Sequence, residues 1–149
     1  MDREILFKGF HEYKEGTDRA FYNGEWHTGE WVYGDLSQHK SGKVFIKPHY
    51  QSATNSKEVA PETVSQYTEV CDESQAKIFE NDIVLEKDEN THKEILYVVV
   101  FSYGSFVLKE IGKRLYRELF QPRGMTRRVI SNKFSNPKLV EDKNGHADI

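Results

Sequence analysis

The chain has 149 residues with 24 acidic and 21 basic side chains, a net charge of −3, and a length that fits one ordinary domain or two very small ones. Hydrophobic residues make up only 37%, but nine Phe, eight Tyr and two Trp supply enough apolar surface to exclude a disordered chain. Because it has neither a run of about 18 apolar residues nor a basic, apolar leader, we expect a cytoplasmic protein that does not bind a membrane.

The first sixty residues favour short strands joined by polar turns. We expect strands at the apolar and aromatic runs 5–7, 31–33 and 44–46. The dipeptide Asn23-Gly24 lies between two aromatic runs and predicts a hairpin, because both residues readily take the positive φ values of a type I′ turn. The polar composition of residues 51–60 then places a domain boundary near residue 60.

The second part of the chain continues with short strands. We expect them at residues 65–68, 82–86, 94–101, 106–108 and 129–130. Five short strands with tight connections predict a small SH3-like barrel.

One segment interrupts this pattern with helical spacing. Apolar residues occupy positions 111, 115, 116, 119 and 120, and Pro122 and Gly124 would end a helix there. The predicted fold is therefore mainly β, or β-rich α+β. It has an N-terminal β-hairpin unit at 1–60, a C-terminal SH3-like small barrel at 61–140 with one short inserted helix near 109–121, and a flexible tail at 141–149.

Separated blocks of sequence carry a resemblance to a known family. They are P-E-T-V-S-Q-Y-T from Pro61, I-F-E-N-D-I-V from Ile78, G-E-W-V-Y-G-D-L from Gly29, V-I-S-N-K-F-S-N-P-K-L from Val129 and F-K-G-F from Phe7. Their order resembles the YopX family of bacteriophage and prophage proteins. The resemblance implies a phage accessory protein that works inside a bacterial host cell, with no assigned molecular activity.

The chain departs from the family pattern where glycines are usual. Glu69 and Ser131 replace glycines, Gln75 begins a pair that replaces an Asn-Gly-like turn, and Asn81 replaces the Gly before Asp82. Asn adopts the left-handed region more readily than other residues that have a side chain. We therefore expect the Asn81 turn to be tolerated, and the other three positions leave the turn geometry open.

Basic residues concentrate between residues 109 and 133, which carry a net charge of +6 against −8 for residues 1–108. They are Lys109, Lys113, Arg114, Arg117, Arg123, Arg127, Arg128 and Lys133. Arginine can bind phosphate through a bidentate fork, and Tyr116, Phe120 or Phe134 could stack on bases nearby. The segment therefore predicts a non-catalytic module that binds nucleic acid.

The same cations admit a different interpretation. They could be solvated or could meet the acidic N-terminal region, within one chain or across a subunit interface. The protein would then be a protein–protein interaction or self-assembling module, with a host or phage protein or a second copy as its partner. Trp26 and Trp31 are candidate interface aromatics. Their odd spacing puts them on opposite faces of a regular strand, so we expect one of them in the core and the other at an interface.

The sequence offers little support for catalysis or for a cofactor. It contains no phosphate-binding loop, nucleophile elbow or zincin motif, its six histidines lack metal-ligand spacing, and Cys71 is its only cysteine. Asp82 and Glu86 would share a strand face, and we interpret Asp82 as a turn residue and Glu86 as a solvated one rather than as nuclease carboxylates. We expect no catalytic or metal site, no cofactor and no enzyme activity; an enzyme with an unrecognised site is the remote alternative.

Overall fold

The chain is mainly β. The computed structural model describes residues 3–49, 55–120 and 123–141, which form antiparallel strands and two short 3₁₀ helices. Its contacts divide the chain into two units, Met1–Tyr67 and Thr68–Ile149. The boundary predicted near residue 60 lies within the first unit, and all but the first residue of the predicted tail lies outside the described residues.

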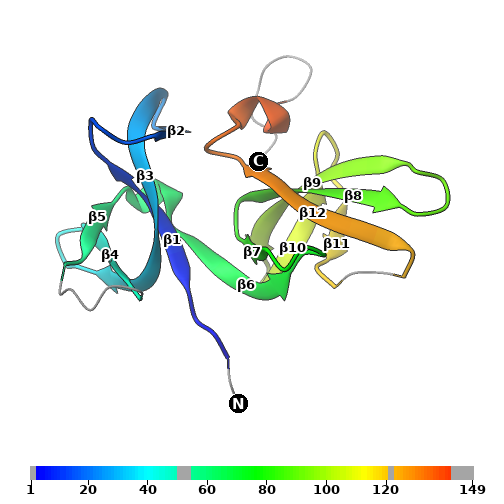
Figure 1. The fold of residues 1–149 in the computed structure, drawn as a ribbon, viewed down its shortest axis with the longest axis horizontal. Helices are drawn as coiled ribbons and strands as arrows, with labels where there is room; N and C mark the ends of the chain where they lie inside the picture. The colour runs from blue at the N-terminus through cyan, green and yellow to red at the C-terminus, as the bar shows by residue number, and fades with distance from the viewer. Residues whose placement is uncertain (1–2, 50–54, 121–122, 142–149) are drawn as a thin grey trace. The chain divides into compact units, whose positions relative to one another are not determined.

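The N-terminal unit is a curled antiparallel sheet built around one long strand. Its strands are β1 (Phe7–Glu12), β2 (Asp18–Tyr22), β3 (Glu25–Gln38), β4 (Val44–Pro48), β5 (Lys57–Val59) and the start of β6 (Ser65–Cys71). The long strand β3 pairs with β1 along one edge and with β2 and then β4 along the other (Figure 1). The predicted hairpin is confirmed, with φ of 53° at Asn23 and 81° at Gly24. Strand β5 forms within the polar segment 51–60, for which no strand was predicted.

Two glycines let β3 approach its neighbours closely. Gly29 lies where β3 passes between β1 and β2, and Gly34 lies where it passes between β1 and β4. A Cβ on Gly29 would lie 2.0 Å from the carbonyl oxygen of His11, and one on Gly34 would lie 1.9 Å from that of Lys47. Only glycine fits at either position. Between them, Val32 enters the core of the unit.

The C-terminal unit contains a second, five-stranded sheet in the order β11-β10-β9-β8-β12. Its strands are β8 (Asp82–Asp88), β9 (Glu94–Ser102), β10 (Ser105–Glu110), β11 (Tyr116–Glu118) and β12 (Met125–Asn132), and β7 (Lys77–Phe79) extends the first sheet beyond β6. Val84 and Val99 pack on one face with Ile78 of β7. Ile83 and Val98 pack on the other face beneath the 3₁₀ helix η2 (Pro137–Val140) (Figure 1).

The second sheet is open, which differs from the predicted barrel. Strands were expected within β6, β8, β9, β10 and β12, and all five are present. The pairing path nevertheless ends at β11 on one side and at β12 on the other, so the described strands form no closed barrel. Short apolar runs identify strands, but the partner of each edge depends on contacts far apart in the sequence.

The predicted helix near 109–121 is wrong, because the described part of this segment forms a hairpin. Gly112 has a φ of 84°, and the backbone N–H of Glu110 donates to the carbonyl of Leu115 at 3.0 Å. Strand β11 then pairs with β10. The apolar residues that suggested one helical face separate: Ile111 and Leu119 pack in different clusters, and Leu115 is exposed. No α-helix occurs among the residues that the structure describes.

None of the described residues forms a helix long and apolar enough to cross a membrane.

Candidate binding surface

The block that begins at Pro61 is a structural junction. It forms the 3₁₀ helix η1 (Pro61–Thr63), with Pro at the position where a missing N–H costs no helical hydrogen bond. The Thr63 hydroxyl oxygen accepts a hydrogen bond from the backbone N–H of Phe10 at 2.9 Å. The Asn23 side chain donates to the Glu62 carboxylate at 2.5 Å. These contacts join η1 to β1 and to the β2–β3 turn, so the residues of the block have a structural role.

The block that begins at Ile78 is a tight turn between β7 and β8. The Asp82 carboxylate accepts the backbone N–H of Phe79 at 2.8 Å and is almost completely buried, which confirms the predicted turn role of Asp82. Asn81 has a φ of 73°, its N–H donates to the carbonyl of Val99 at 2.8 Å, and its carbonyl accepts the N–H of Lys133 at 3.0 Å. These contacts hold the turn against β9 and the end of β12.

Three of the four positions at which the sequence lacks an expected glycine still have a positive φ. Glu69, Gln75 and Asn81 have φ values of 74°, 67° and 73°. Ser131 is not among the described residues with positive φ and instead follows an irregularity in the pairing of β12 with β8. The positive φ is therefore retained at residues with a side chain, in turns at Gln75 and Asn81 and within strand β6 at Glu69.

Glu86 and Arg127 form a buried ion pair in the C-terminal sheet. Both side chains are fully buried, and Nε and Nη2 of Arg127 lie 2.7 Å and 2.6 Å from Oε2 of Glu86. Arg117 donates to the other carboxylate oxygen, and its guanidinium lies 5.1 Å from the centre of the Tyr97 ring. The interpretation of Glu86 as a solvated residue is wrong, because the register of β8 and β12 places it opposite Arg127.

The buried guanidinium of Arg127 also organises the chain after β11. It donates to the carbonyl oxygens of Leu119 and Phe120, the latter at 3.3 Å. Its charge is thus satisfied by one carboxylate and two carbonyls in the interior. Arg127 therefore cannot serve as a surface contact for a partner.

The basic residues between 109 and 133 do not form one surface. Lys109 and Arg127 are buried, Arg117 and Lys133 are partly buried, and Lys113, Arg114, Arg123 and Arg128 are exposed. Lys109 donates to the carbonyl of Lys113 at 3.0 Å, and the Lys113 ammonium lies 3.6 Å from Glu110. Burial lowers the pKa of Lys133, and the negative charge of Glu80 partly offsets this by raising the same pKa. Much of the positive charge is therefore met within the C-terminal unit itself.

Arg128 lines a surface pocket of about 470 Å³. Lys87 and His92 line it together with the acidic residues Glu73, Glu89 and Glu94. The lining therefore contains both cations and carboxylates, so the pocket does not present the uniformly positive surface that a phosphate backbone requires.

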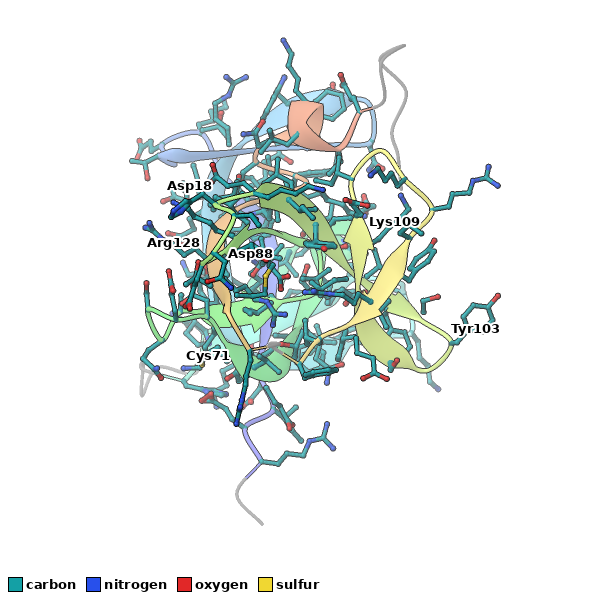
Figure 2. The ribbon with its side chains drawn as sticks, turned by 90° about the vertical axis from the view of Figure 1, so that its right-hand side faces the viewer. Asp18, Cys71, Asp88, Tyr103, Lys109 and Arg128 are labelled. Atoms are coloured by element: carbon teal, nitrogen blue, oxygen red, sulfur yellow. The ribbon has the colours of Figure 1, made fainter. Side chains whose placement is uncertain are left out.

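Aromatic side chains gather at the β9–β10 hairpin, for which the sequence predicted no site. Phe101 and Tyr103 are exposed there, and Phe106 is partly buried against the core of the sheet. Phe101 is 57% exposed and stands opposite Phe106 in the strand register, with ring centres 5.1 Å apart. Tyr103 is fully exposed at the tip and projects away from the sheet (Figure 2). Of the predicted stacking residues, Tyr116 and Phe120 are exposed and Phe134 is buried. We call Phe101, Tyr103 and Phe106 the hairpin surface.

Tyr103 occupies an unfavourable position in this turn. With φ of 49° at Tyr103 and 83° at Gly104, the two-residue loop has the positive φ values of a type I′ turn. The first position of such a turn favours Asn, Asp or Gly, and the β2–β3 hairpin has Asn23 there. The Tyr-Gly pair between two apolar strands is the sequence feature that could have indicated this site, and the sequence-based prediction did not use it.

The two tryptophans lie in different surroundings within the N-terminal unit. Trp26 is 43% exposed, with the Arg19 guanidinium 4.5 Å from its ring centre. Trp31 is partly buried and packs edge-on against the fully buried ring of Phe10, with centres 5.3 Å apart. Trp26 therefore offers the larger free surface.

In the part of the chain that the structure describes, no three His, Cys, Asp or Glu side chains come together in a way that could hold a metal ion.

A family model described as YopX protein matches residues 19–141. The match confirms the predicted resemblance over most of the chain, although it begins after the block at Phe7. No curated protein matches the chain.

Proposed function

The chain belongs to the YopX protein family, and we propose that it is a non-catalytic protein-interaction module that binds its partner through the hairpin surface. The observation that supports this most directly is Tyr103, a large and fully exposed aromatic residue at a backbone position that favours Asn or Gly.

Folding alone gives no reason for tyrosine at this position. A left-handed backbone costs a residue with a Cβ about 1 kcal/mol, and Asn or Gly would reduce that cost. The exposed ring gains little from burial in the isolated chain. Burial against a partner would offset the cost, because tyrosine is frequent among the residues that dominate interface energies.

The family blocks support the same assignment indirectly. Glu62, Thr63 and Asp82 are used in turns and junctions, and Gly29 and Gly34 are required by close backbone approaches. These residues specify the fold. The hairpin surface lies outside the blocks. Within it, Phe106 packs against the core of the C-terminal sheet and Phe101 packs on Phe106, so Tyr103 is the aromatic residue there whose described contacts show no structural role.

Binding and self-association measurements on Tyr103→Asn test the proposal. The variant keeps a compatible turn and removes the ring, and Ile130→Thr is the matched control because it removes an exposed apolar group from β12, which is not adjacent to β9 or β10. Oligomeric mass is measured by light scattering, and capture from host lysate is quantified by mass spectrometry for all three proteins.

We expect the parent and Ile130→Thr to behave alike: both self-associate, or both capture the same protein from the lysate. Tyr103→Asn should bind that partner with roughly 30-fold lower affinity, as expected when an interface hot spot is removed. Equal binding by Tyr103→Asn and the parent would overturn the proposal. A parent that stays monomeric and captures no protein would overturn it as well.

Nucleic acid is a second candidate partner, supported by the exposed side chains of Arg114, Arg123 and Arg128. The test is the affinity of a fluorescent single-stranded probe at low and high salt for the parent and for Arg114→Glu/Arg123→Glu. Arg127 is left unchanged, because its replacement would disrupt the interior. Binding that weakens steeply with salt and is lost in the double variant would support this candidate, and unchanged binding in the variant would exclude it.

A further inference from the structure

His27 in the N-terminal unit has polar partners on both ring nitrogens. Its side chain is only 11% exposed, and its ring stacks on that of Tyr22 with centres 3.7 Å apart and planes 9° apart. Nδ1 lies 3.3 Å from a carboxylate oxygen of Glu12, and Nε2 lies 3.1 Å from the carbonyl oxygen of Tyr22. A carboxylate oxygen of Glu25 lies 3.8 Å from Nε2.

Every one of these partners is a hydrogen-bond acceptor. A neutral imidazole has one N–H donor and one lone pair, so in either tautomer one nitrogen would direct its lone pair at an acceptor. The imidazolium has two N–H donors and satisfies both sides. The neutral ring can donate to only one of the two sides. The Tyr22 carbonyl is the closer acceptor and is fixed by the backbone, whereas the Glu12 side chain is 60% exposed and can turn to water, so the neutral ring keeps its N–H on Tyr22. We propose that His27 is a proton-operated latch, which holds the Glu12 carboxylate when it is protonated and releases it when it is neutral.

The other partner of Glu12 does not change over the same pH range. The Tyr22 phenol is hydrogen-bonded to Glu12, and burial, together with the charges of Glu12 and Glu62, raises the pKa of Tyr22 to about 12. The phenol therefore stays neutral across the range in which histidine titrates, roughly pH 5 to 8. The changing contact to Glu12 is the one from His27.

The latch lies between two surface pockets of the N-terminal unit. Glu12 and His27 line both a pocket of about 540 Å³ that includes Trp26 and a pocket of about 470 Å³ that includes Tyr22. The other titratable groups around the two pockets are His11, Tyr13 and Lys14 on and after β1, Glu58 on β5 and Glu62 on η1. Release of Glu12 would therefore alter the shape and charge of both pockets.

The test follows Glu12 and His27 by NMR on the full chain. The Glu12 side-chain carboxyl carbon is recorded from pH 5 to pH 8 in the parent, in His27→Gln, and in His39→Gln as a control that removes a different histidine. The His27 ring nitrogens are recorded over the same range in the parent and in His39→Gln. Gln can occupy the site and does not titrate.

We expect the Glu12 signal of the parent to shift with the same midpoint as the His27 ring. The shift should persist in His39→Gln and disappear in His27→Gln. A Glu12 signal that stays constant while His27 loses its proton would overturn the proposal, and so would a shift that persists in His27→Gln. The circular dichroism spectrum and the amide spectrum establish that the variants are folded.

Discussion

At the scale of single residues, the chain keeps left-handed backbone positions without glycine. Glu69, Gln75, His92 and Tyr103 all have positive φ values, although none of them favours that region as glycine does. Each position costs stability that a glycine would largely restore. The chain therefore carries local backbone strain at several turns and within strand β6.

Replacement of Gln75 by glycine should relieve such strain. Gln75 is exposed and has a φ of 67°, and its backbone N–H donates to the carbonyl of Asp72. Its side chain makes no hydrogen bond to the other residues that the structure describes. We expect Gln75→Gly to raise the free energy of unfolding by about 0.5–1 kcal/mol, since the relief of strain exceeds the entropy that glycine adds to the unfolded chain. Urea denaturation measures the change.

Glu118→Gly is the control for Gln75→Gly. Glu118 is exposed in strand β11 and lacks a positive φ, so glycine there should lower stability by about 0.5–1 kcal/mol. A loss of stability in Gln75→Gly similar to that in Glu118→Gly would contradict the assignment of strain.

At the scale of the elements, two hairpins of the same turn class differ at one position. The β2–β3 turn has Asn23 and the β9–β10 turn has Tyr103 at the first loop residue, and both have glycine at the second. Comparing the two turns therefore distinguishes a residue that suits the backbone of a hairpin from a residue that is kept for binding at its tip.

Exchange of these residues should have opposite effects. We expect Tyr103→Asn to stabilise the chain by about 1 kcal/mol, and Asn23→Tyr to destabilise it by more, because Asn23 also donates to Glu62. Thermal and urea denaturation of the two variants test this. If Tyr103→Asn proves destabilising, Tyr103 has a structural role and the proposed interaction surface loses its main support.

The pairing of β8 with β12 depends on the buried ion pair of Glu86 and Arg127. We expect Arg127→Met to lower the free energy of unfolding by about 3–5 kcal/mol, because it leaves a buried carboxylate with Arg117 alone. The double variant Glu86→Leu/Arg127→Met should lose clearly less than the sum of the two single changes. Additive losses in this double-mutant cycle, measured by denaturation, would show that the two side chains do not interact.

At the scale of the whole molecule, a buried carboxylate should make stability depend on pH. Asp72 accepts the backbone N–H of Val129 at 2.9 Å, and the N–H groups of Ser74 and Ala76 at 2.8 Å and 2.9 Å. Burial raises the pKa of Asp72, but these hydrogen bonds and the charge of Arg128 outweigh it and place the pKa below its ordinary value. The carboxylate joins the β6–β7 turn to β12.

Acid unfolding should reveal this contribution. A carboxyl with a lowered pKa in the folded state stabilises the protein fully above its unfolded pKa of about 4, and the contribution is lost as the pH falls through the folded value. We expect Asp72→Asn to be less stable than the parent by about 2 kcal/mol at pH 7 and to lose less stability on acidification below pH 4. Urea denaturation at several pH values measures both, with Glu118→Gln as an exposed control. Parallel pH profiles for Asp72→Asn and the parent would contradict this role.

The sequence by itself determined the family, the β class and the features that depend on a few adjacent residues. The Asn23-Gly24 turn, the Asp82 turn and most strands were predicted correctly, because φ preferences and short apolar runs are local properties. Tyr103 could have been identified from the Tyr-Gly pair, but exposure, which makes it a candidate, is known only from the folded chain.

Only the tertiary structure decided which groups meet across long separations. It paired Glu86 with Arg127, 41 residues apart, and thereby turned a predicted surface cation and a predicted solvated acid into one buried pair. It formed the β10–β11 hairpin where apolar spacing suggested a helix, because strand pairing and a left-handed Gly112 outweighed that spacing. The charged and apolar residues along a chain show which side chains need an ion-pair partner or a place in the core. The register of the strands determines which residues become their neighbours.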